Sequence, residues 1–255
     1  MIGNGKTSLK IVHTADVHLG DDLQPELARR AFLAVLDRVV AEAADLLIIA
    51  GDLFDSSRAA RANLDFALHA LGRLPVPVVL LPGNHDPYDE GSVYRESDIV
   101  ERCPHVHLIT GTEGELLRFP DLHLTIWGRP VVEHCPDFRP LGNLPERSGN
   151  HWHVAVAHGF HVPIGEDTYR SSPISDEAIA GAGWDYLALG HVHPYREVSQ
   201  GGVVACYSGS PACFSALEGS AGRVALVELH VQRGVSVRPL AVHPSPPRRR
   251  GGQGG

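Results

Sequence analysis

The feature that most constrains the fold is a regular alternation of short apolar runs and longer amphipathic stretches in the first third of the chain. The apolar runs cover residues 9–14, 46–50 and 76–81, and the stretches between them, 25–44 and 59–74, have the spacing of amphipathic helices. This order of strand, helix, strand, helix and strand predicts a parallel sheet.

The pattern changes after about residue 104, where the β-like segments become shorter and little helix separates the first of them. These segments predict a second sheet with more antiparallel pairing. The expected strands cover residues 106–109, 115–119, 122–127, 152–157, 186–189, 203–207, 224–231 and 235–240, and a helix is expected at 175–180. We therefore expect an α/β fold, a four-layer αββα sandwich of two mixed β-sheets packed together and flanked by helices.

Length and composition are those of a single domain. The chain has 255 residues, 43% of them hydrophobic, which is enough to bury one substantial core. We expect a domain over residues 9–243, a flexible leader over 1–8 and a disordered tail over 244–255. No window is apolar enough for a signal peptide or a membrane span, so we expect a cytoplasmic protein without a membrane partner. The formal net charge of −8 gives no general attraction to nucleic acid, so phosphodiester binding requires a locally positive site.

The best-defined chemistry lies at the ends of the apolar runs. Five runs are each followed by a residue that can bind a metal ion, namely Asp16, Asp52, Asn84, His158 and His191. Because ligands of open α/β sheets bind beyond the carboxyl ends of the strands, these side chains can converge although they are far apart in sequence. Each residue alone is more simply a polar residue in a turn. Five together favour a metal site.

The residue types indicate two transition-metal ions. With His18 and His193, the set combines oxygen ligands with imidazoles, a mixture that suits Mn²⁺, Fe²⁺ or Zn²⁺ better than Ca²⁺. Seven ligands are too many for one ion. Two ions about 3.5 to 4 Å apart that share one carboxylate, for which Asp52 is the candidate, account for all seven. We expect both ions to be Mn²⁺.

Five short motifs carry these residues in a fixed order along most of the chain. They are Asp16-Val17-His18, Gly51-Asp52-Leu53-Phe54-Asp55, Gly83-Asn84-His85-Asp86, His158-Gly159 and Gly190-His191-Val192-His193. This series resembles the signature of the calcineurin-like metallophosphoesterases. The resemblance implies a binuclear metal-dependent phosphoesterase of that fold.

The resemblance also implies a role for each side chain. One metal would be held by Asp16, His18, Asp52 and His193, and the other by Asp52, Asn84, His158 and His191. His85 would lie over the substrate and either donate a proton to the leaving oxygen or stabilise the transition state, with Asp55 as its partner. Asp86 is interpreted as a local cap.

Within that superfamily, the chain is most similar to the SbcD-type DNA repair nucleases. The similarity lies in residues 11–20, in residues 51–55 and in the Tyr-Ser-Gly-Ser-Pro segment 207–211, which would place Tyr207, Ser208 and Ser210 near the substrate phosphate. The last segment can also be an ordinary turn. Protein serine/threonine phosphatases of the superfamily usually have arginine directly after the motif that ends at Asp55, whereas this chain has Ser56.

The SbcD pattern continues into a capping domain and a region that joins an ATPase partner. Residues 194–255 follow the last ligand here, and much of that length must complete the core. We therefore expect a stand-alone nuclease, with the ATPase partnership in doubt. An open site favours single-stranded or flapped DNA, cleaved by a metal-bridging hydroxide. Aromatic and arginine side chains suit unpaired bases, and the candidate strand contacts are Tyr88, Tyr94, Arg95, Phe160, Tyr169 and Arg170.

Two other functions remain open from sequence. The motifs do not set the size of the substrate, so the enzyme could be a phosphodiesterase or phosphatase of a small nucleotide or metabolite. A non-catalytic scaffold with the same fold is the alternative from a different class, and a broken ligand set would be its mark. All seven ligands and His85 are present here.

Overall fold

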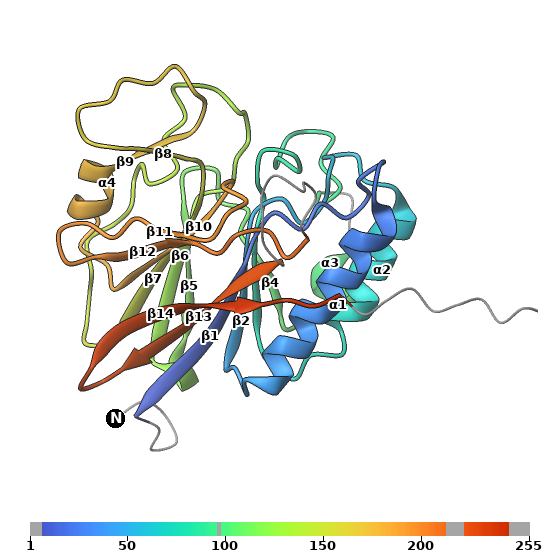
Figure 1. Cartoon of the computed structure of the whole chain (residues 1–255), viewed down its shortest axis with the longest axis horizontal. Coiled ribbons are helices and arrows are strands. Elements are labelled where there is room, and N and C mark those ends of the chain that lie inside the picture. Colours follow the sequence, from blue (N-terminus) through green and yellow to red (C-terminus); the bar gives the residue numbers. More distant parts are fainter. Residues whose placement is uncertain (1–6, 96–97, 213–221, 245–255) are drawn as a thin grey trace, which may run out of the picture.

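Two six-stranded sheets, packed face to face, make up the body of the protein (Figure 1). The computed structural model describes residues 7–95, 98–212 and 222–244. Of the expected leader and tail, only residues 7, 8 and 244 are among these, and Ser8 is already the first residue of strand β1. The rest of both segments lies outside the described residues.

The first sheet contains the predicted parallel unit. Its order is β14-β13-β1-β2-β3-β4, with parallel pairing from β1 to β4 and antiparallel pairing of β13 with both β1 and β14. The strands are β1 (Ser8–Thr14), β2 (Leu46–Ala50), β3 (Val78–Leu81), β4 (Val106–Leu108), β13 (Arg223–His230) and β14 (Gly234–Ala241). From sequence we assigned β4, β13 and β14 to the second sheet, which was wrong. β4 pairs in parallel with β3, and β13 pairs with both β1 and β14.

Three helices cover the outer face of this sheet (Figure 1). They are α1 (Pro25–Ala41), α2 (Arg61–Leu71) and the short α3 (Ile99–Arg102). Both long helices are shorter than predicted, and α1 begins at a proline, whose fixed φ suits a first helical position. Phe32 and Val35 of α1 and Leu68 of α2 are buried in the same core as Leu47 and Ile49 of β2.

The second sheet is less antiparallel than we predicted from sequence. Its order is β11-β12-β10-β7-β6-β5, and only the outermost pair at each edge is antiparallel. The strands are β5 (Glu115–Phe119), β6 (Leu124–Gly128), β7 (Trp152–His158), β10 (Tyr186–Gly190), β11 (Arg196–Glu197) and β12 (Val204–Tyr207). Its central strands are parallel because the long segments between them return the chain to the same end of the sheet.

These crossovers contain little helix. The first is the loop 129–151, and the second contains β8 (Phe160–Val162), β9 (Pro173–Ser175) and the single helix α4 (Asp176–Gly181). The helical layer on this side is therefore thin. Ile179 of α4, Trp184 and Leu141 of the loop cover the outer face of the second sheet.

The central core lies between the two sheets. Ile48 of β2 and Val79 of β3 pack there with Ile126 of β6, Val154 of β7 and Ala188 of β10. This packing fixes the two sheets relative to each other and brings the carboxyl ends of β1, β2, β3, β7 and β10 to one region. Among the described residues, no helix is both long and apolar enough to cross a membrane.

Candidate metal centre

The loops after β1 and β2 run side by side and carry three of the predicted ligands. The backbone N–H of Val17 donates to the Asp52 carbonyl at 2.8 Å, and that of Leu19 donates to the Leu53 carbonyl at 2.9 Å. Asp16, His18 and Asp52 all have positive φ, between 54° and 55°. Non-glycine residues seldom adopt this conformation, and in folded proteins it concentrates at functional sites. The loops are therefore strained at the residues that carry the site.

Asp86 joins the second of these loops to the loop after β3. Its Oδ1 accepts the N–H groups of Asp52 at 3.1 Å and Gly83 at 2.7 Å, and its Oδ2 accepts Phe54 N–H at 2.9 Å and the Tyr94 hydroxyl at 2.5 Å. The carboxyl group is fully buried. Burial raises the pKa of Asp86 to about 7, and the charge of Asp52 acts in the same direction. Its predicted capping role thus extends across two loops.

Five of the seven predicted ligand side chains form two overlapping groups that have Asp16 in common. The ligand atoms of Asp16, His18 and His193 lie within 4.8 Å of one another, as do those of Asp16, Asp52 and His158. The Asn84 amide oxygen lies 2.8 Å from His158 Nε2 and 2.8 Å from His191 Nδ1. His158 Nε2 is also 3.3 Å from Asp52 Oδ2. The donor set of oxygens and imidazoles fits two ions that share a carboxylate.

Backbone contacts hold the imidazoles in this arrangement. His158 Nδ1 is 2.8 Å from the Ala50 carbonyl at the end of β2, which leaves Nε2 toward the other ligands. His191 has a positive φ of 101°, and its N–H lies 3.1 Å from both Asp16 oxygens. A Cβ on Gly190 would lie 1.9 Å from the Ala50 carbonyl, so only glycine permits this approach of β10 to β2.

Burial and mutual interactions shift the pKa values of several side chains of the centre. Burial opposes ionisation of Asp52, but the attraction of His158 and the hydrogen bond between the two hold the pKa of Asp52 well below its usual value. Burial alone would lower the pKa of His158, whereas Asp52 raises it to about 9. Burial and the nearby His158 lower the pKa of His191 to about 3. Burial raises the pKa of Asp16 despite the attraction of His158. Such clustering of shifted groups is typical of functional sites.

His85 lies at the open side of the centre. Its side chain is 46% exposed, and its ring centroid is 4.7 Å from that of His18. Its backbone N–H donates to Asp52 Oδ1 at 2.9 Å. Asp55 Oδ1 lies 3.5 Å from His85 Nδ1 but only 2.9 Å from His18 Nδ1, so its closer contact is with His18. His85 thus exposes its imidazole, while its backbone is hydrogen-bonded to Asp52, the proposed bridging residue.

A family model described as calcineurin-like phosphoesterase matches residues 9–195, which include every residue of this centre. The chain belongs to the calcineurin-like phosphoesterase family. This is a family of metal-dependent hydrolases with a dimetal centre, in agreement with the resemblance seen in the sequence motifs.

Curated relatives include a DNA repair protein. The chain is 30% identical over 233 residues to the DNA double-strand break repair protein Mre11 of Methanopyrus kandleri. The matched region covers 82% of this chain and 50% of that protein. It is 26% identical over 230 residues to the uncharacterized metallophosphoesterase YhaO of Bacillus subtilis, with 80% and 53% covered. The chain therefore spans about half the length of these relatives.

Solved structures share the fold at low sequence identity. TT1561 of Thermus thermophilus matches with a TM-score of 0.58 at 12% identity, covering 93% of this chain and all of that one. A dimetal phosphatase from Danio rerio matches with a TM-score of 0.57 at 12% identity, covering 93% and 99%. These likenesses show the fold of the metallophosphoesterase, two mixed sheets with few helices.

Segment 207–211, predicted to lie near the substrate phosphate, has buried side chains that are hydrogen-bonded inside the protein. Tyr207 and Ser208 are fully buried, and Ser210 is 5% exposed. The Tyr207 hydroxyl donates to the Gly159 carbonyl at 2.8 Å, and the Ser210 hydroxyl donates to the Asp16 carbonyl at 2.7 Å. These side chains support the ligand loops of the metallophosphoesterase, and their burial argues against direct contact with substrate.

The candidate strand contacts divide into buried and exposed residues. Tyr94 is 3% exposed and bonded to Asp86, so its prediction as a strand contact was wrong. Two arginine–aromatic pairs lie on the surface. The Arg95 guanidinium is 4.4 Å from the Tyr88 ring centroid, and that of Arg170 is 4.2 Å from the Phe160 centroid. Tyr169 is 95% exposed.

Sequence reasoning overlooked one histidine beside the centre. The ring centroid of His134, in the loop after β6, lies 5.7 Å from that of His191, at an interplanar angle of 48°. Partial burial lowers the pKa of His134, and the charge of His158 adds to this effect. The residue belongs to no motif, and only its place in a long loop within the matched region could have drawn attention to it.

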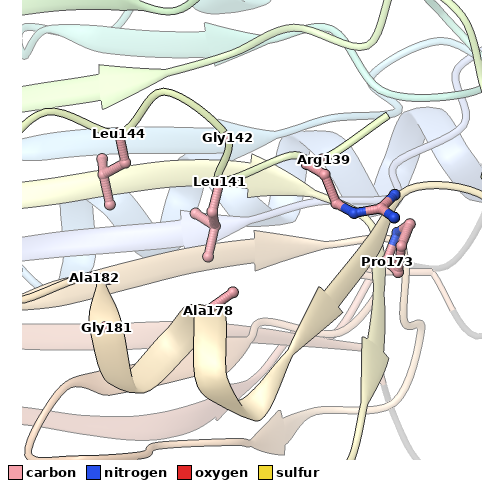
Figure 2. A pocket seen from close by; sticks show the side chains of 8 residues that line it. All are labelled: Arg139, Leu141, Gly142, Leu144, Pro173, Ala178, Gly181 and Ala182. Carbon is pink, nitrogen blue, oxygen red and sulfur yellow. The ribbon is translucent and has the colours of Figure 1, made fainter. Parts of the chain in front are cut away.

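A separate cavity of about 370 Å³ lies between α4 and the loop 129–151 (Figure 2). Its lining is mostly apolar and includes Leu141, Leu144 and Ala178, with Arg139 extending toward Pro173. None of the predicted ligands lines it. This cavity is therefore distinct from the metal centre of the metallophosphoesterase.

Proposed function

We propose that this metallophosphoesterase is a nuclease that hydrolyses phosphodiester bonds of single-stranded or flapped DNA. The observation that carries the proposal is the complete convergent set of seven ligands with His85, in a chain 30% identical to a protein named for DNA double-strand break repair. A scaffold that had lost catalysis would not be expected to keep every one of these side chains.

In this proposal the two ions would be Mn²⁺. Asp16, His18, Asp52 and His193 would hold the first, and Asp52, Asn84, His158 and His191 would hold the second. When bound, two such ions supply positive charge for the phosphate and a nucleophile at neutral pH. They would also provide a locally positive site in a chain of net charge −8.

His85 assists departure of the leaving oxygen. Its imidazole is exposed, so it can reach a bound phosphodiester, and its backbone is fixed to Asp52 by a hydrogen bond of 2.9 Å. Asp55 Oδ1, at 3.5 Å from His85 Nδ1, helps to orient the ring. A histidine in this position can donate a proton to the leaving oxygen or stabilise charge on the phosphate.

Single-stranded substrate is favoured by the surface around the centre. The Phe160 ring has Arg170 over one face. Its centroid is 6.5 Å from that of His191, a proposed ligand of the second ion. The Tyr88–Arg95 pair lies on the chain segment that follows His85. Partly exposed aromatic rings such as Phe160 and Tyr88 can stack on unpaired bases, and arginine attracts the phosphates between them.

The test is cleavage of end-labelled linear and covalently closed circular single-stranded DNA with Mn²⁺, run beside bis-p-nitrophenyl phosphate. We expect cleavage of DNA by the wild type and its loss in Asp52→Ala and His85→Ala, with His69→Ala, an exposed histidine of α2, as the matched control. Cleavage of both DNAs indicates an endonuclease, and cleavage of linear DNA alone indicates an exonuclease. Hydrolysis of only the small ester would contradict the nuclease proposal and indicate a metabolite phosphodiesterase.

A further inference from the structure

The loop that carries His134 is hydrogen-bonded to two other segments near the metal centre, residues 82–88 and Ser172. On one side, Val131 N–H donates to the Pro82 carbonyl at 3.2 Å and Tyr88 N–H donates to the Val131 carbonyl at 2.7 Å. These bonds join the loop to the segment that carries Asn84 and His85. Backbone hydrogen bonds therefore hold the loop in place and set the position of His134 beside the predicted ligands.

On the other side, Ser172 fixes both the backbone and the ring. Its N–H donates to the Cys135 carbonyl at 3.0 Å, and its own carbonyl accepts Phe160 N–H at 2.9 Å. Its hydroxyl lies 3.1 Å from His134 Nδ1. Ser172 is fully buried and has a positive φ of 54°, which is uncommon for serine. A buried, strained serine thus orients an imidazole that is itself exposed to solvent.

The surroundings of His134 suit contact with a phosphate group. Its ring lies beside His191, at the edge of the centre, and its Nδ1 already faces the Ser172 hydroxyl. When the Ser172 hydroxyl donates to Nδ1, the neutral ring carries its proton on Nε2, which is then a donor for an anionic oxygen.

We propose that His134 binds the phosphate group at the metal centre through Nε2, and that Ser172 is the residue that positions its ring. His134 and His85 then both contact the substrate, His134 from beside His191 and His85 from beside His18. The proposal rests on phosphoester hydrolysis at this centre and not on DNA as the substrate, so it applies equally to a small phosphodiester.

The experiment compares four variants of the full chain loaded with Mn²⁺. His134→Ala removes the imidazole, His134→Asn keeps a polar atom near the position of Nδ1, and His134→Gln places an amide donor near the position of Nε2. Ser172→Ala removes the positioning hydroxyl. His69→Ala is the control for a change of histidine on the surface. The two measurements are the dissociation constant of inorganic phosphate by calorimetry and the kinetics with bis-p-nitrophenyl phosphate.

We expect His134→Ala and His134→Asn to weaken phosphate binding by about 10- to 100-fold, the range for a hydrogen bond to a charged group, and to lower kcat/KM in parallel. His134→Gln should recover most of the loss, and Ser172→Ala should show an intermediate effect. Mn²⁺ content and the melting temperature should match those of His69→Ala.

Unchanged phosphate affinity in His134→Ala would overturn the proposal, as would loss of bound Mn²⁺, which would make the residue a metal ligand. Failure of His134→Gln to recover binding lost in His134→Asn would also contradict a contact through Nε2. If the wild type hydrolyses the small ester but cleaves no DNA, the nuclease proposal fails, whereas the comparison of the His134 variants retains its meaning.

Discussion

Replacing Asp86 by asparagine tests whether one buried carboxylate holds the ligand loops together. Each of its two oxygens accepts two hydrogen bonds, from Asp52 and Gly83 on one side and from Phe54 and Tyr94 on the other. The amide of asparagine has one oxygen and one NH₂ group. In either orientation the NH₂ group faces at least one buried backbone N–H, which loses its acceptor.

The magnitude follows from the number of donors affected. An unsatisfied buried donor costs about 1 to 3 kcal/mol. Above pH 7, where Asp86 is mostly ionised because its pKa is raised to about 7, the lost charge also weakens the two bonds that remain. We therefore expect Asp86→Asn to lower the free energy of unfolding by about 2 to 4 kcal/mol. Because the Asp52 backbone is one of the donors, Mn²⁺ affinity should fall by about 10- to 100-fold, as when other partners of ligand residues are removed.

Urea denaturation in a chelator measures the first effect, and calorimetric titration with Mn²⁺ measures the second. Tyr94→Phe is the matched control, since it removes only one of the four donors. We expect it to lower the free energy of unfolding by about 1 kcal/mol and to leave metal affinity unchanged. An Asp86→Asn variant that stays within about 0.5 kcal/mol of the wild type, a typical surface substitution, and binds Mn²⁺ normally would refute this reasoning.

Three further predictions concern residues around the centre. Tyr207→Phe removes a buried hydroxyl contact and should lower the free energy of unfolding by about 1 kcal/mol, with KM for bis-p-nitrophenyl phosphate unchanged; a raised KM would restore its predicted substrate role. Burial lowers the pKa of His13 to about 3, so the unfolded state, with a pKa of about 6.5, binds the proton more readily. Stability is then present above about pH 6.5 and falls toward pH 3 by up to about 1.4 kcal/mol per pH unit, and His13→Gln should reduce this slope in urea titrations with chelator. Arg170→Ala should weaken single-stranded DNA binding and reduce its logarithmic salt slope by about 0.7 without changing hydrolysis of the small ester. The control is Arg233→Ala, at an exposed arginine of the β13–β14 turn, which should change neither DNA binding nor hydrolysis of the small ester. Equal losses of DNA binding in the two variants would indicate general charge attraction.

The parts of the fold that sequence predicted were those encoded locally. The first three strands and two helices have clear periodicity, and the ligand residues directly follow strands whose ends must meet at one edge of a sheet. The helix ends were predicted less accurately, since α2 ends at Leu71 with Gly72 as its C-cap, before the predicted end at residue 74. Local patterns were thus sufficient to predict which side chains converge.

The errors arose where long-range pairing decides the outcome. β4 has three residues, and nothing within them shows that they pair with β3 rather than with β5. The loop 129–151 lacks helical periodicity, so it did not look like a crossover between the parallel strands β6 and β7. Burial of Tyr94 and Tyr207 depends on neighbours contributed by distant segments. For the same reason, the place of His134 beside His191 could not be inferred from sequence.

The central claim is that seven converging side chains hold two metal ions that share Asp52. The most direct test is the number of Mn²⁺ ions bound per chain, measured by equilibrium dialysis on wild type and Asp52→Ala, with circular dichroism to show that both are folded. The account predicts two ions for the wild type and at most one tightly bound ion for the variant. A folded wild type that binds fewer than two ions, or an Asp52→Ala variant that keeps both, would contradict it.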